Sequence, residues 1–280
     1  MMKNLTKLGL ICGLMVAISD FKYPQLVNLE AIAATISAAF RLKLPPPPNR
    51  GIAGNRHGAA SRIATKDPIS EHGSEPPVIT AFVPEYQNIA PGQTGVWGLT
   101  TNQYPTFWFY ISEIKSPLYR LDFSLLDRES QADRLIYQTS LKNPQQAGII
   151  NFALPSSSQP LILNKLYRWE LKFVLKSNNK SRIVVKGWIQ RSDLDAQLRD
   201  RLKQSNSAEQ AALYANNGFW YDAFTTVADR HYIQPQDPEI DRVWQILLDS
   251  IQLGNLADRS LVMNQPTNQI PLPRSGDRGF

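Results

Sequence analysis

The chain has 280 residues, of which 42% are hydrophobic and 19% are charged, and its formal net charge is +6. This length suits one large or two small domains with buried cores, and the composition excludes a wholly disordered chain and a protein with many membrane spans. The positive charge is dispersed among 24 acidic residues. A nucleic-acid binder carries a dense basic stripe, so nucleic acid is not predicted as a partner.

The N-terminus has the order of a signal peptide. Lys3 and Lys7 precede an apolar run over residues 8–18, which has the length of a signal-peptide core and is too short to span a bilayer as a helix. Small residues suit cleavage by signal peptidase at three places, which end at Ser19, Ala33 and Ala39. We therefore predict a signal peptide within residues 1–39 and a secreted protein, periplasmic or extracellular.

Residues 40–77 are predicted to be a linker. Four consecutive prolines from Pro45 favour polyproline II, and the Gly-, Ser- and Asn-rich residues after them do not form a packed core. Gly51, Gly54 and Gly58 alternate with arginines, as in a phosphate-binding loop. No strand precedes these glycines and no Lys-Ser or Lys-Thr pair follows them, so the composition favours a flexible, mildly basic tether.

A β-sandwich-like domain is predicted over residues 78–191. Turn signals such as Asn143-Pro144 separate short apolar runs at the spacing of a sandwich or barrel. In the run 105–111 aromatic residues occupy both faces, as expected for a strand that is covered on both sides. The predicted strands, about eight in number and expected to be antiparallel, are 78–83, 94–100, 105–111, 118–126, 134–141, 148–154 and the two strands of a long hairpin over 166–191.

The hairpin is predicted to have one apolar and one basic face. With residues 177–181 as the loop, Phe173 pairs with Val185 and Trp169 with Ile189, so one face is wholly apolar. On the other face Lys172 stands opposite Lys186, which makes this patch a candidate surface for an anionic partner. A solvated face whose lysines prevent edge pairing is the alternative. The basic residues of this face are Arg168, Lys172, Lys176, Arg182 and Lys186.

Two of the six tryptophans suggest a further binding mode. Most tryptophans fall within periodic apolar patterns and are predicted to be buried. Trp97, in a Gly-rich turn, and Trp188, on the charged face, are the least explained by packing. Exposed tryptophans stack on sugars, so glycan binding or glycan chemistry through these two rings is the alternative function.

Four amphipathic helices are predicted over residues 192–261, followed by a disordered tail over 262–280. Ser192 is expected to cap the first helix, Ser207 to begin the capping box of the second, and Asp237 to cap the fourth. The third helix has apolar residues at helical spacing from Trp220 onward. The predicted fold class is therefore α+β, with a β-sandwich followed by a small helical region.

A catalytic or metal site is not predicted. His57 and His72 lie in the linker, and His231 has no second histidine at metal-ligand spacing. Cys12, the one cysteine, lies in the N-terminal apolar run, so a chain cleaved after it holds no disulfide or cysteine nucleophile. Scattered carboxylates, with no spacing that pairs them for glycoside hydrolysis, are Glu85, Asp122, Glu170 and Asp222. We predict no catalytic residue, no metal and no cofactor, and do not expect an enzyme.

The order of several motifs resembles the domain of unknown function 928 family. The motifs are Pro105-Thr106-Phe107-Trp108-Phe109-Tyr110, Tyr167-Arg168-Trp169, Gly187-Trp188-Ile189-Gln190-Arg191 and Gly218-Phe219-Trp220-Tyr221-Asp222-Ala223, together with the strand over 148–155. The resemblance implies an exported protein of mainly cyanobacterial type and implies no activity. Residues 214–235 also resemble one tetratricopeptide unit, and a single unit is expected to be a helical hairpin docked on the sheet.

The leading hypothesis is a non-enzymatic binding or adaptor module of the cell envelope. Its predicted partner is an envelope protein or an acidic polysaccharide. Peripheral contact of the basic hairpin face with lipid headgroups is a third, weaker hypothesis.

Overall fold

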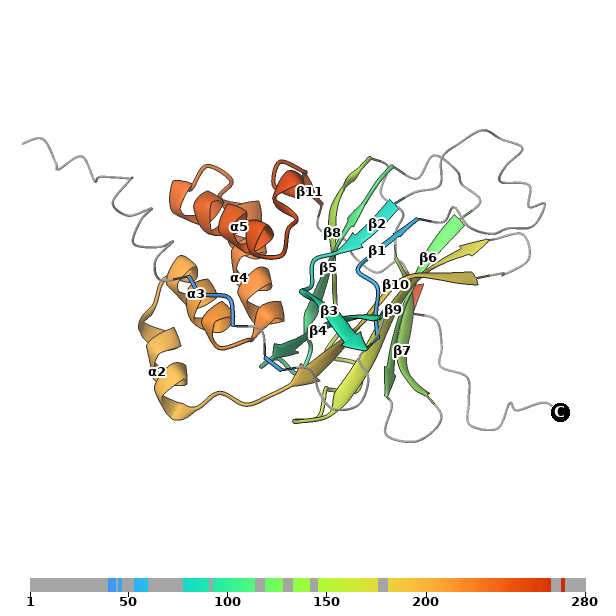
Figure 1. The fold of residues 1–280 in the computed structure, drawn as a ribbon, viewed down its shortest axis with the longest axis horizontal. Coiled ribbons are helices and arrows are strands. Elements are labelled where there is room, and N and C mark those ends of the chain that lie inside the picture. The colour runs from blue at the N-terminus through green and yellow to red at the C-terminus, as the bar shows by residue number, and fades with distance from the viewer. Residues whose placement is uncertain are drawn as a thin grey trace, which may run out of the picture.

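The computed structural model describes residues 40–43, 45–46, 53–59, 78–90, 93–113, 119–127, 133–141, 146–175, 181–262 and 268–269. In these residues two β-sheets are followed along the chain by four α-helices (Figure 1), which confirms the predicted α+β class. The predicted signal peptide and Lys176 lie outside the described residues, as does the predicted tail apart from Val262 and the short strand over 268–269.

The two sheets have five and seven strands in the described ranges. The smaller sheet has the order β1 (His57–Ala59), β2 (Val78–Ala81), β5 (Thr106–Ile111), β8 (Gly148–Ala153) and β11 (Leu261–Val262). The larger sheet has the order β12 (Asn268–Gln269), β7 (Arg134–Leu141), β6 (Tyr119–Asp127), β9 (Leu166–Leu175), β10 (Ser181–Arg191), β4 (Gln93–Thr100) and β3 (Glu85–Ala90). All eight predicted strands are present, but the pairs β4–β10 and β8–β11 are parallel, whereas antiparallel pairing was predicted.

Aromatic side chains from both sheets meet in the core of the sandwich. The ring centroids of Phe107 in β5 and Phe123 in β6 lie 4.8 Å apart, and those of Phe123 and Phe152 in β8 lie 4.5 Å apart. On the other side of β5, Trp108 is also buried, and its Nε1 donates to Thr225 Oγ1 in the helical region at 3.1 Å. The prediction that this strand is covered on both faces is therefore confirmed.

The hairpin of β9 and β10 has a different register from the predicted one. Glu170 pairs with Lys186, whereas the predicted register places Glu170 opposite the residue two positions later in β10. A β-bulge between Ile183 and Val185 shifts the pairing by one more residue. A shift of two residues keeps each side chain on the same side of the sheet, so the apolar face still builds the core. Lys172 stands opposite Ile183, so the predicted pairing of Lys172 with Lys186 is wrong.

Residues 53–59, which were expected in the linker, join the two sheets, and we call them the N-terminal strap. Asn55 exchanges backbone hydrogen bonds of 3.0 and 3.1 Å with Lys186 of β10. The carbonyl of Arg56 accepts a backbone N–H of β2 at 2.9 Å, and β1 then pairs with β2. Gly54 permits the close approach, because a Cβ there would lie 2.8 Å from the carbonyl oxygen of Lys186.

The helices begin close to the predicted positions, with two corrected caps. Asp195, not Ser192, caps the first helix by accepting from Leu198 N, and Asn206, not Ser207, forms the capping box of the second. Asp237 caps the fourth helix as predicted. The helices are α2 (Ala196–Gln204), α3 (Ser207–Asn216), α4 (Trp220–Ile233) and α5 (Pro238–Ser250), and the short 3₁₀ helix η2 (Gly254–Leu256) follows them.

Two neighbouring residues at the start of α4 attach the helices to the sheets. Trp220 Nε1 donates to the carbonyl of Phe82, just after β2, at 2.7 Å. The Tyr221 hydroxyl accepts from Trp169 Nε1 at 2.7 Å and donates to the Trp188 carbonyl at 3.1 Å. One continuous core of buried residues therefore includes both sheets and the helices α3, α4 and α5.

Residues 40–43 and 45–46 also contact the folded part of the chain. Lys43 N donates to the carbonyl of Ala215 in α3 at 3.1 Å, and the Tyr86 hydroxyl donates to the carbonyl of Pro45 at 3.0 Å. The predicted linker therefore contains pieces, these and the strap, that tie it to the helices and to both sheets.

Arg56 of the strap anchors the end of α5, and its loss is expected to destabilise the fold. This side chain is 5% exposed, and it donates to the carbonyl of Ile251, the C-terminal capping residue of α5, at 2.8 Å. Arg56→Ala leaves a helix-end carbonyl without this donor and is expected to lower the free energy of unfolding by about 2 kcal/mol. Urea unfolding measures this, with Arg41→Ala as the exposed control, and equal midpoints for the two variants would contradict the anchoring role.

Candidate functional site

The predicted basic residues whose side chains are described lie on the outer face of the seven-stranded sheet, the face that points away from the five-stranded sheet. Alternate residues of β9, such as Trp169, are buried in the core, which places Arg168 and Lys172 on the outer face. Lys186 of β10 lies beside them, because it pairs with Glu170. For Arg182 only the backbone position in β10 is described.

Glu170 is the centre of this surface. Its residue is 2% exposed, and its carboxylate accepts from Arg168 and from Lys172, each at 2.9 Å. Arg168 also binds the carboxylate of Asp133. A buried carboxylate is tolerated only when it is paired and hydrogen-bonded, and here Arg168 and Lys172 supply those partners.

Asp122 of β6 forms a second centre of the same kind. Arg120 binds its carboxylate through Nε at 2.7 Å and through NH2 at 2.9 Å, and Ser140 Oγ donates to it at 2.8 Å. In the ladder Asp122 stands opposite Lys172 of β9. The two buried acids therefore lie close together on the same face of the sheet, each held by its own cations.

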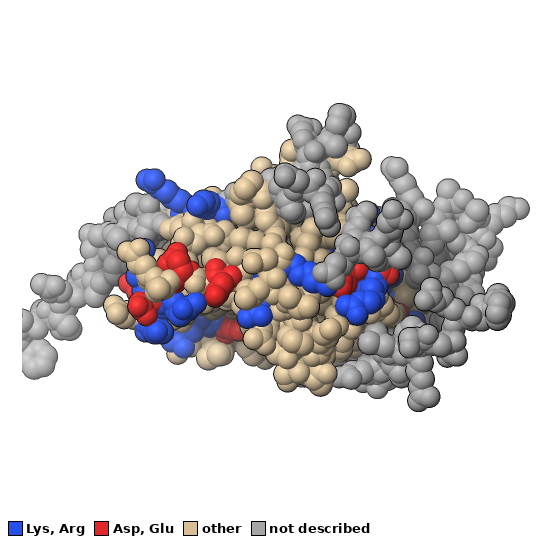
Figure 2. All heavy atoms as spheres, turned by 90° about the horizontal axis from the view of Figure 1, so that it is seen from below, with Lys and Arg blue, Asp and Glu red and all other residues tan. Residues whose placement is uncertain are grey.

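The acids lie inside this network and the cations lie at its surface. The side chains of Asp122 and Glu170 are 3% and 2% exposed, whereas those of Arg120, Arg168 and Lys172 are 35%, 20% and 25% exposed. Solvent therefore meets positive groups first, although each is paired. We call Arg120, Arg168, Lys172 and Lys186 the cation rim. Figure 2 shows acidic and basic side chains next to one another on the face that it draws.

The two tryptophans chosen from the sequence are buried, at 3% exposure for Trp97 and 2% for Trp188. Trp188 Nε1 donates to the carbonyl of Ala53, just before Gly54, at 3.2 Å, and the guanidinium of Arg168 lies 5.9 Å from its ring centroid. Tyr86 packs against Trp97, with 6.4 Å between ring centroids. Neither ring is accessible to a sugar, so the prediction of glycan binding through these exposed tryptophans is wrong. The other four tryptophans are buried as predicted.

Asp122 and Glu170 are two of the four scattered carboxylates considered from the sequence, and the fold brings these two close together. They are diagonal neighbours on β6 and β9, because Asp122 stands opposite Lys172 and Ser124 opposite Glu170. Diagonal neighbours lie about 7–8 Å apart, which is within the range of inverting glycosidases. Both carboxylates, however, are buried and held by cations, so the arrangement favours a structural ion-pair network over hydrolysis.

Asp222, in the first turn of α4, is the most perturbed acid in the described residues. Its carboxylate accepts from Thr101 Oγ1 at 2.6 Å and from Thr101 N at 3.0 Å, at the end of β4. Burial raises its pKa to about 6 against the opposing effect of these hydrogen bonds. Tyr214 of α3 lies nearby, and its own pKa is raised, first by burial and then by the charge of Asp222. The sequence places Asp222 in a family-like motif and among the four scattered carboxylates, but it assigns this residue no role.

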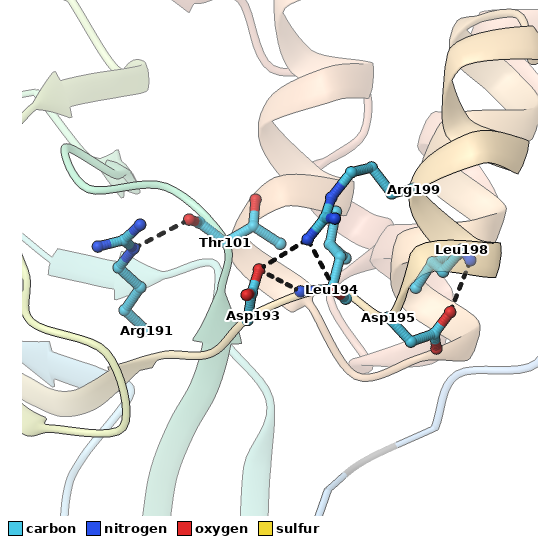
Figure 3. A network of polar contacts seen from close by, with 7 residues as sticks. All are labelled: Thr101, Arg191, Asp193, Leu194, Asp195, Leu198 and Arg199. Atoms are coloured by element: carbon cyan, nitrogen blue, oxygen red, sulfur yellow. Dashed lines mark hydrogen bonds and ion pairs between the residues drawn. The ribbon is translucent and has the colours of Figure 1, made fainter.

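The surroundings of Thr101 connect β4 with the start of the helical region. Figure 3 shows Arg191, at the end of β10, donating from Nε to the Thr101 carbonyl at 3.2 Å. Further along the chain Arg199 binds Asp193 at 3.1 Å. Asp222 and Thr101 therefore lie at the helix–sheet junction, where their contacts hold the two parts together. A hydroxyl and a carboxylate at this distance could exchange a proton, but all their contacts serve that junction.

The histidines do not assemble a metal site in the described ranges. His57 lies in β1, where its Nδ1 is 3.0 Å from Thr80 Oγ1, and its pKa is lowered chiefly by burial. His231 stacks on Trp244 and lies 3.4 Å from Asp241. In the part of the chain that the structure describes, no group of three or more His, Cys, Asp or Glu side chains is placed to hold a metal ion. None of the described helices is long and apolar enough to cross a membrane.

Comparison with known proteins assigns the matched region without assigning a chemistry. The model of the Domain of Unknown Function (DUF928) family matches residues 57–261, which covers all the described strands except β12, and all four described α-helices. A search of the curated proteins gave no match. The match begins at the first residue of β1 and ends in β11, so it follows the boundaries of the fold closely.

Proposed function

This chain belongs to the DUF928 family, and we propose that it is an exported, non-enzymatic binding or adaptor module of the cell envelope. Support for a non-enzymatic role comes from the structural contacts that its buried acidic side chains make. Glu170, Asp122 and Asp222 hold strands and helices together, and they do not converge on a shared reactive centre. The charge-then-apolar order of residues 1–18 supports export.

The proposed partner is an acidic polysaccharide, and the proposed contact is the cation rim. The observation that carries this proposal is the separation of charges by depth, with buried carboxylates and partly exposed cations. Because the pairs are fixed by the sheet, the cations are held in rows before a ligand arrives, which reduces the entropy lost on binding. An envelope protein with an acidic surface is the other partner class that fits these charges.

Neutralising two rim cations is expected to weaken polysaccharide binding. In Lys172→Gln/Lys186→Gln, Glu170 keeps the hydrogen bond from Arg168 at 2.9 Å, so the fold is retained. The dissociation constant for polygalacturonate is expected to rise on the order of tenfold, since an exposed ionic contact contributes up to about 1 kcal/mol. The wild-type affinity is expected to fall as the Debye length shortens from about 30 to about 8 Å with added salt.

The control for this test carries the same charge change on another part of the molecule. Arg199→Gln/Lys203→Gln on α2 removes two cations whose side chains are 48% and 68% exposed. Equal weakening in both double variants would indicate attraction by net charge alone and would remove the cation rim as the binding surface.

Export is tested separately by cell fractionation and by the mass of the mature chain. The expected result is an envelope protein that has lost residues up to Ser19, Ala33 or Ala39. A cytoplasmic protein that retains Lys3 and Lys7 would contradict the proposal.

A further inference from the structure

A rigid loop before β9 presents two neighbouring aliphatic side chains to solvent. Leu161 is fully buried, whereas the next two residues, Ile162 and Leu163, are 50% and 42% exposed. Exposed aliphatic residues that occur singly need no explanation, but an adjacent pair on a fixed loop leaves a persistent apolar tip. The tip lies at the end of the seven-stranded sheet where β10 leaves toward α2 (Figure 1).

Hydrogen bonds on both sides of the tip hold the loop in place. Leu161 N donates to Gln103 O at 3.0 Å, and Arg191 NH1 donates to Leu161 O at 3.1 Å. After the tip, Asn164 N donates to Arg191 O at 2.7 Å, and Asn164 has a φ of 59°, in the left-handed region that asparagine tolerates. The exposure of Ile162 and Leu163 is therefore set by the fold.

Two basic residues near the tip bind the same carboxylate, that of Asp127. Lys165, two residues after Leu163, binds Asp127 at 2.7 Å, and Arg134 binds the same carboxylate oxygen at 3.0 Å. The side chains of Asp127 and Lys165 are 2% and 12% exposed, whereas that of Arg134 is 62% exposed, so Arg134 is the cation of this group that faces solvent. As on the outer face, the acid is inside and a cation is outside, so the border of the apolar tip is positive.

We propose that this sheet end, made of Ile162, Leu163, Lys165 and Arg134, docks on an anionic lipid bilayer, with the two aliphatic side chains entering the headgroup region. A rigid apolar tip with a positive border is complementary to a bilayer surface, where apolar area is buried and cations meet anionic headgroups. A soluble polysaccharide offers charge to the border but no apolar phase to the tip. This surface is separate from the cation rim, so a protein that uses both would connect a membrane to a polysaccharide.

A second adjacent pair of exposed apolar side chains in the described residues has basic and acidic neighbours in about equal number and provides a comparison. Tyr232 and Ile233, at the end of α4, are 49% and 67% exposed. Asp229, one turn earlier on the same helix, is half-buried, and burial raises its pKa. Arg230 and His231 lie in the last turn of this helix, and His231 lies 3.4 Å from Asp241, so acids and bases are mixed around the pair. The α4 end is therefore a poorer match for anionic headgroups than the sheet end, although its apolar exposure is at least as large.

Vesicle flotation tests the proposal with the full chain. Vesicles of equal parts phosphatidylglycerol and phosphatidylcholine are expected to carry the wild-type protein, and vesicles of phosphatidylcholine alone to carry less. Ile162→Ser/Leu163→Ser is expected to lower the partition coefficient on the order of tenfold to thirtyfold, since each side chain buries about half its area. Tyr232→Ser/Ile233→Ser is expected to leave it unchanged.

An environment-sensitive label gives a second readout that does not depend on removing the tip. Cys12 is the one cysteine, so Ile162→Cys or Ile233→Cys in a Cys12→Ser background can be labelled with a nitrobenzoxadiazole dye. A blue shift with anionic vesicles at position 162 alone supports insertion of the tip. Absence of that shift, or equal losses in the two serine variants, overturns the proposal.

Measuring polygalacturonate binding and flotation on the same variants separates this inference from the proposed function. If Ile162→Ser/Leu163→Ser abolished polygalacturonate binding and left flotation intact, the occupant of the sheet end would be the polysaccharide and the lipid proposal would be overturned. Loss of flotation in this variant together with intact polygalacturonate binding supports two separate surfaces. Loss of polygalacturonate binding in the rim variant bears only on the cation rim.

Discussion

Replacing Tyr221 with phenylalanine is expected to lower the free energy of unfolding by about 2–3 kcal/mol, although only one oxygen atom is lost. The Tyr221 hydroxyl accepts from Trp169 Nε1 at 2.7 Å and donates to the Trp188 carbonyl at 3.1 Å. Trp169 is fully buried, so in Tyr221→Phe its indole N–H has no water to replace the hydroxyl. An unpaired buried donor costs more than the hydrogen bond was worth, and this explains the size of the effect.

Urea unfolding followed by circular dichroism measures this change. The midpoint is expected to fall with an unchanged m-value, because the folded state keeps its shape. Tyr232→Phe removes the same atom from a side chain that is 49% exposed and is expected to shift the free energy by less than about 0.5 kcal/mol. Similar midpoints for both variants would show that the hydroxyl of Tyr221 does not connect the helices to the sheets.

The stability of the protein is expected to fall as pH rises from about 4 to about 7, through the ionisation of Asp222. In the folded chain burial raises its pKa to about 6. In the unfolded chain an aspartate has a pKa of about 3.9, so between these values the folded state binds more protons. The stabilisation is fully present below the unfolded pKa and is lost as pH rises through the folded pKa. The expected loss is about 1–3 kcal/mol, since Asp222 is only partly shielded from solvent.

Asp222→Asn isolates this contribution from other groups that titrate. The asparagine still accepts from Thr101 N and can donate to Thr101 Oγ1, so its stability relative to the wild type is expected to increase with pH. The pKa of His57 is lowered chiefly by burial, so His57 acts in the opposite direction. Its contribution to the stability of the protein is lost as pH falls below about 6.5, and this loss is the same in both proteins. A difference between the two proteins that stays constant across this pH range would contradict the raised pKa of Asp222.

Asp127 titrates outside this window. Its burial favours the neutral form, but Lys165 and then Arg134 outweigh that effect and hold its pKa below the usual value. Its stabilisation is therefore present above the unfolded pKa of about 3.9 and is lost only in more acidic solution. Acid unfolding and the change expected from Asp222 can be separated in one pH series.

The regular elements of this fold could be predicted from local patterns, and the short ones could not. Strands such as β5 and β7 have an apolar periodicity that does not depend on the rest of the chain. The strands β1 and β11 have three and two residues and no periodicity of their own. They exist because distant strands offer unpaired backbone groups to them. The glycines that identified the linker, such as Gly54, are also what allows the strap to approach Lys186.

The prediction of the candidate site was incomplete for a similar reason, because the residues that surround it in space come from distant parts of the sequence. The hairpin pattern correctly placed Arg168 and Lys172 on one face, but it did not show that Asp122 of β6 would stand opposite Lys172. Trp188 was selected because the alternation along its strand places it on the charged face of the hairpin. The chain that covers it, at Ala53, is 135 residues away. A periodic pattern reports which way a side chain points, and burial also depends on what lies beyond it.

The N-terminal strap has a consequence for the order in which the chain folds. Its partners, Lys186 in β10 and Ile251 at the end of α5, belong to the last parts of the domain to be synthesised, and the Arg56 contact spans 195 residues. Loop closure over such distances costs entropy before any contact forms, and such topologies fold slowly. The strap can complete its contacts only after α5 has been made. A chain that is secreted while still unfolded would therefore complete this step at its destination. Pulse-labelling hydrogen exchange at Asn55 during refolding would time that closure directly.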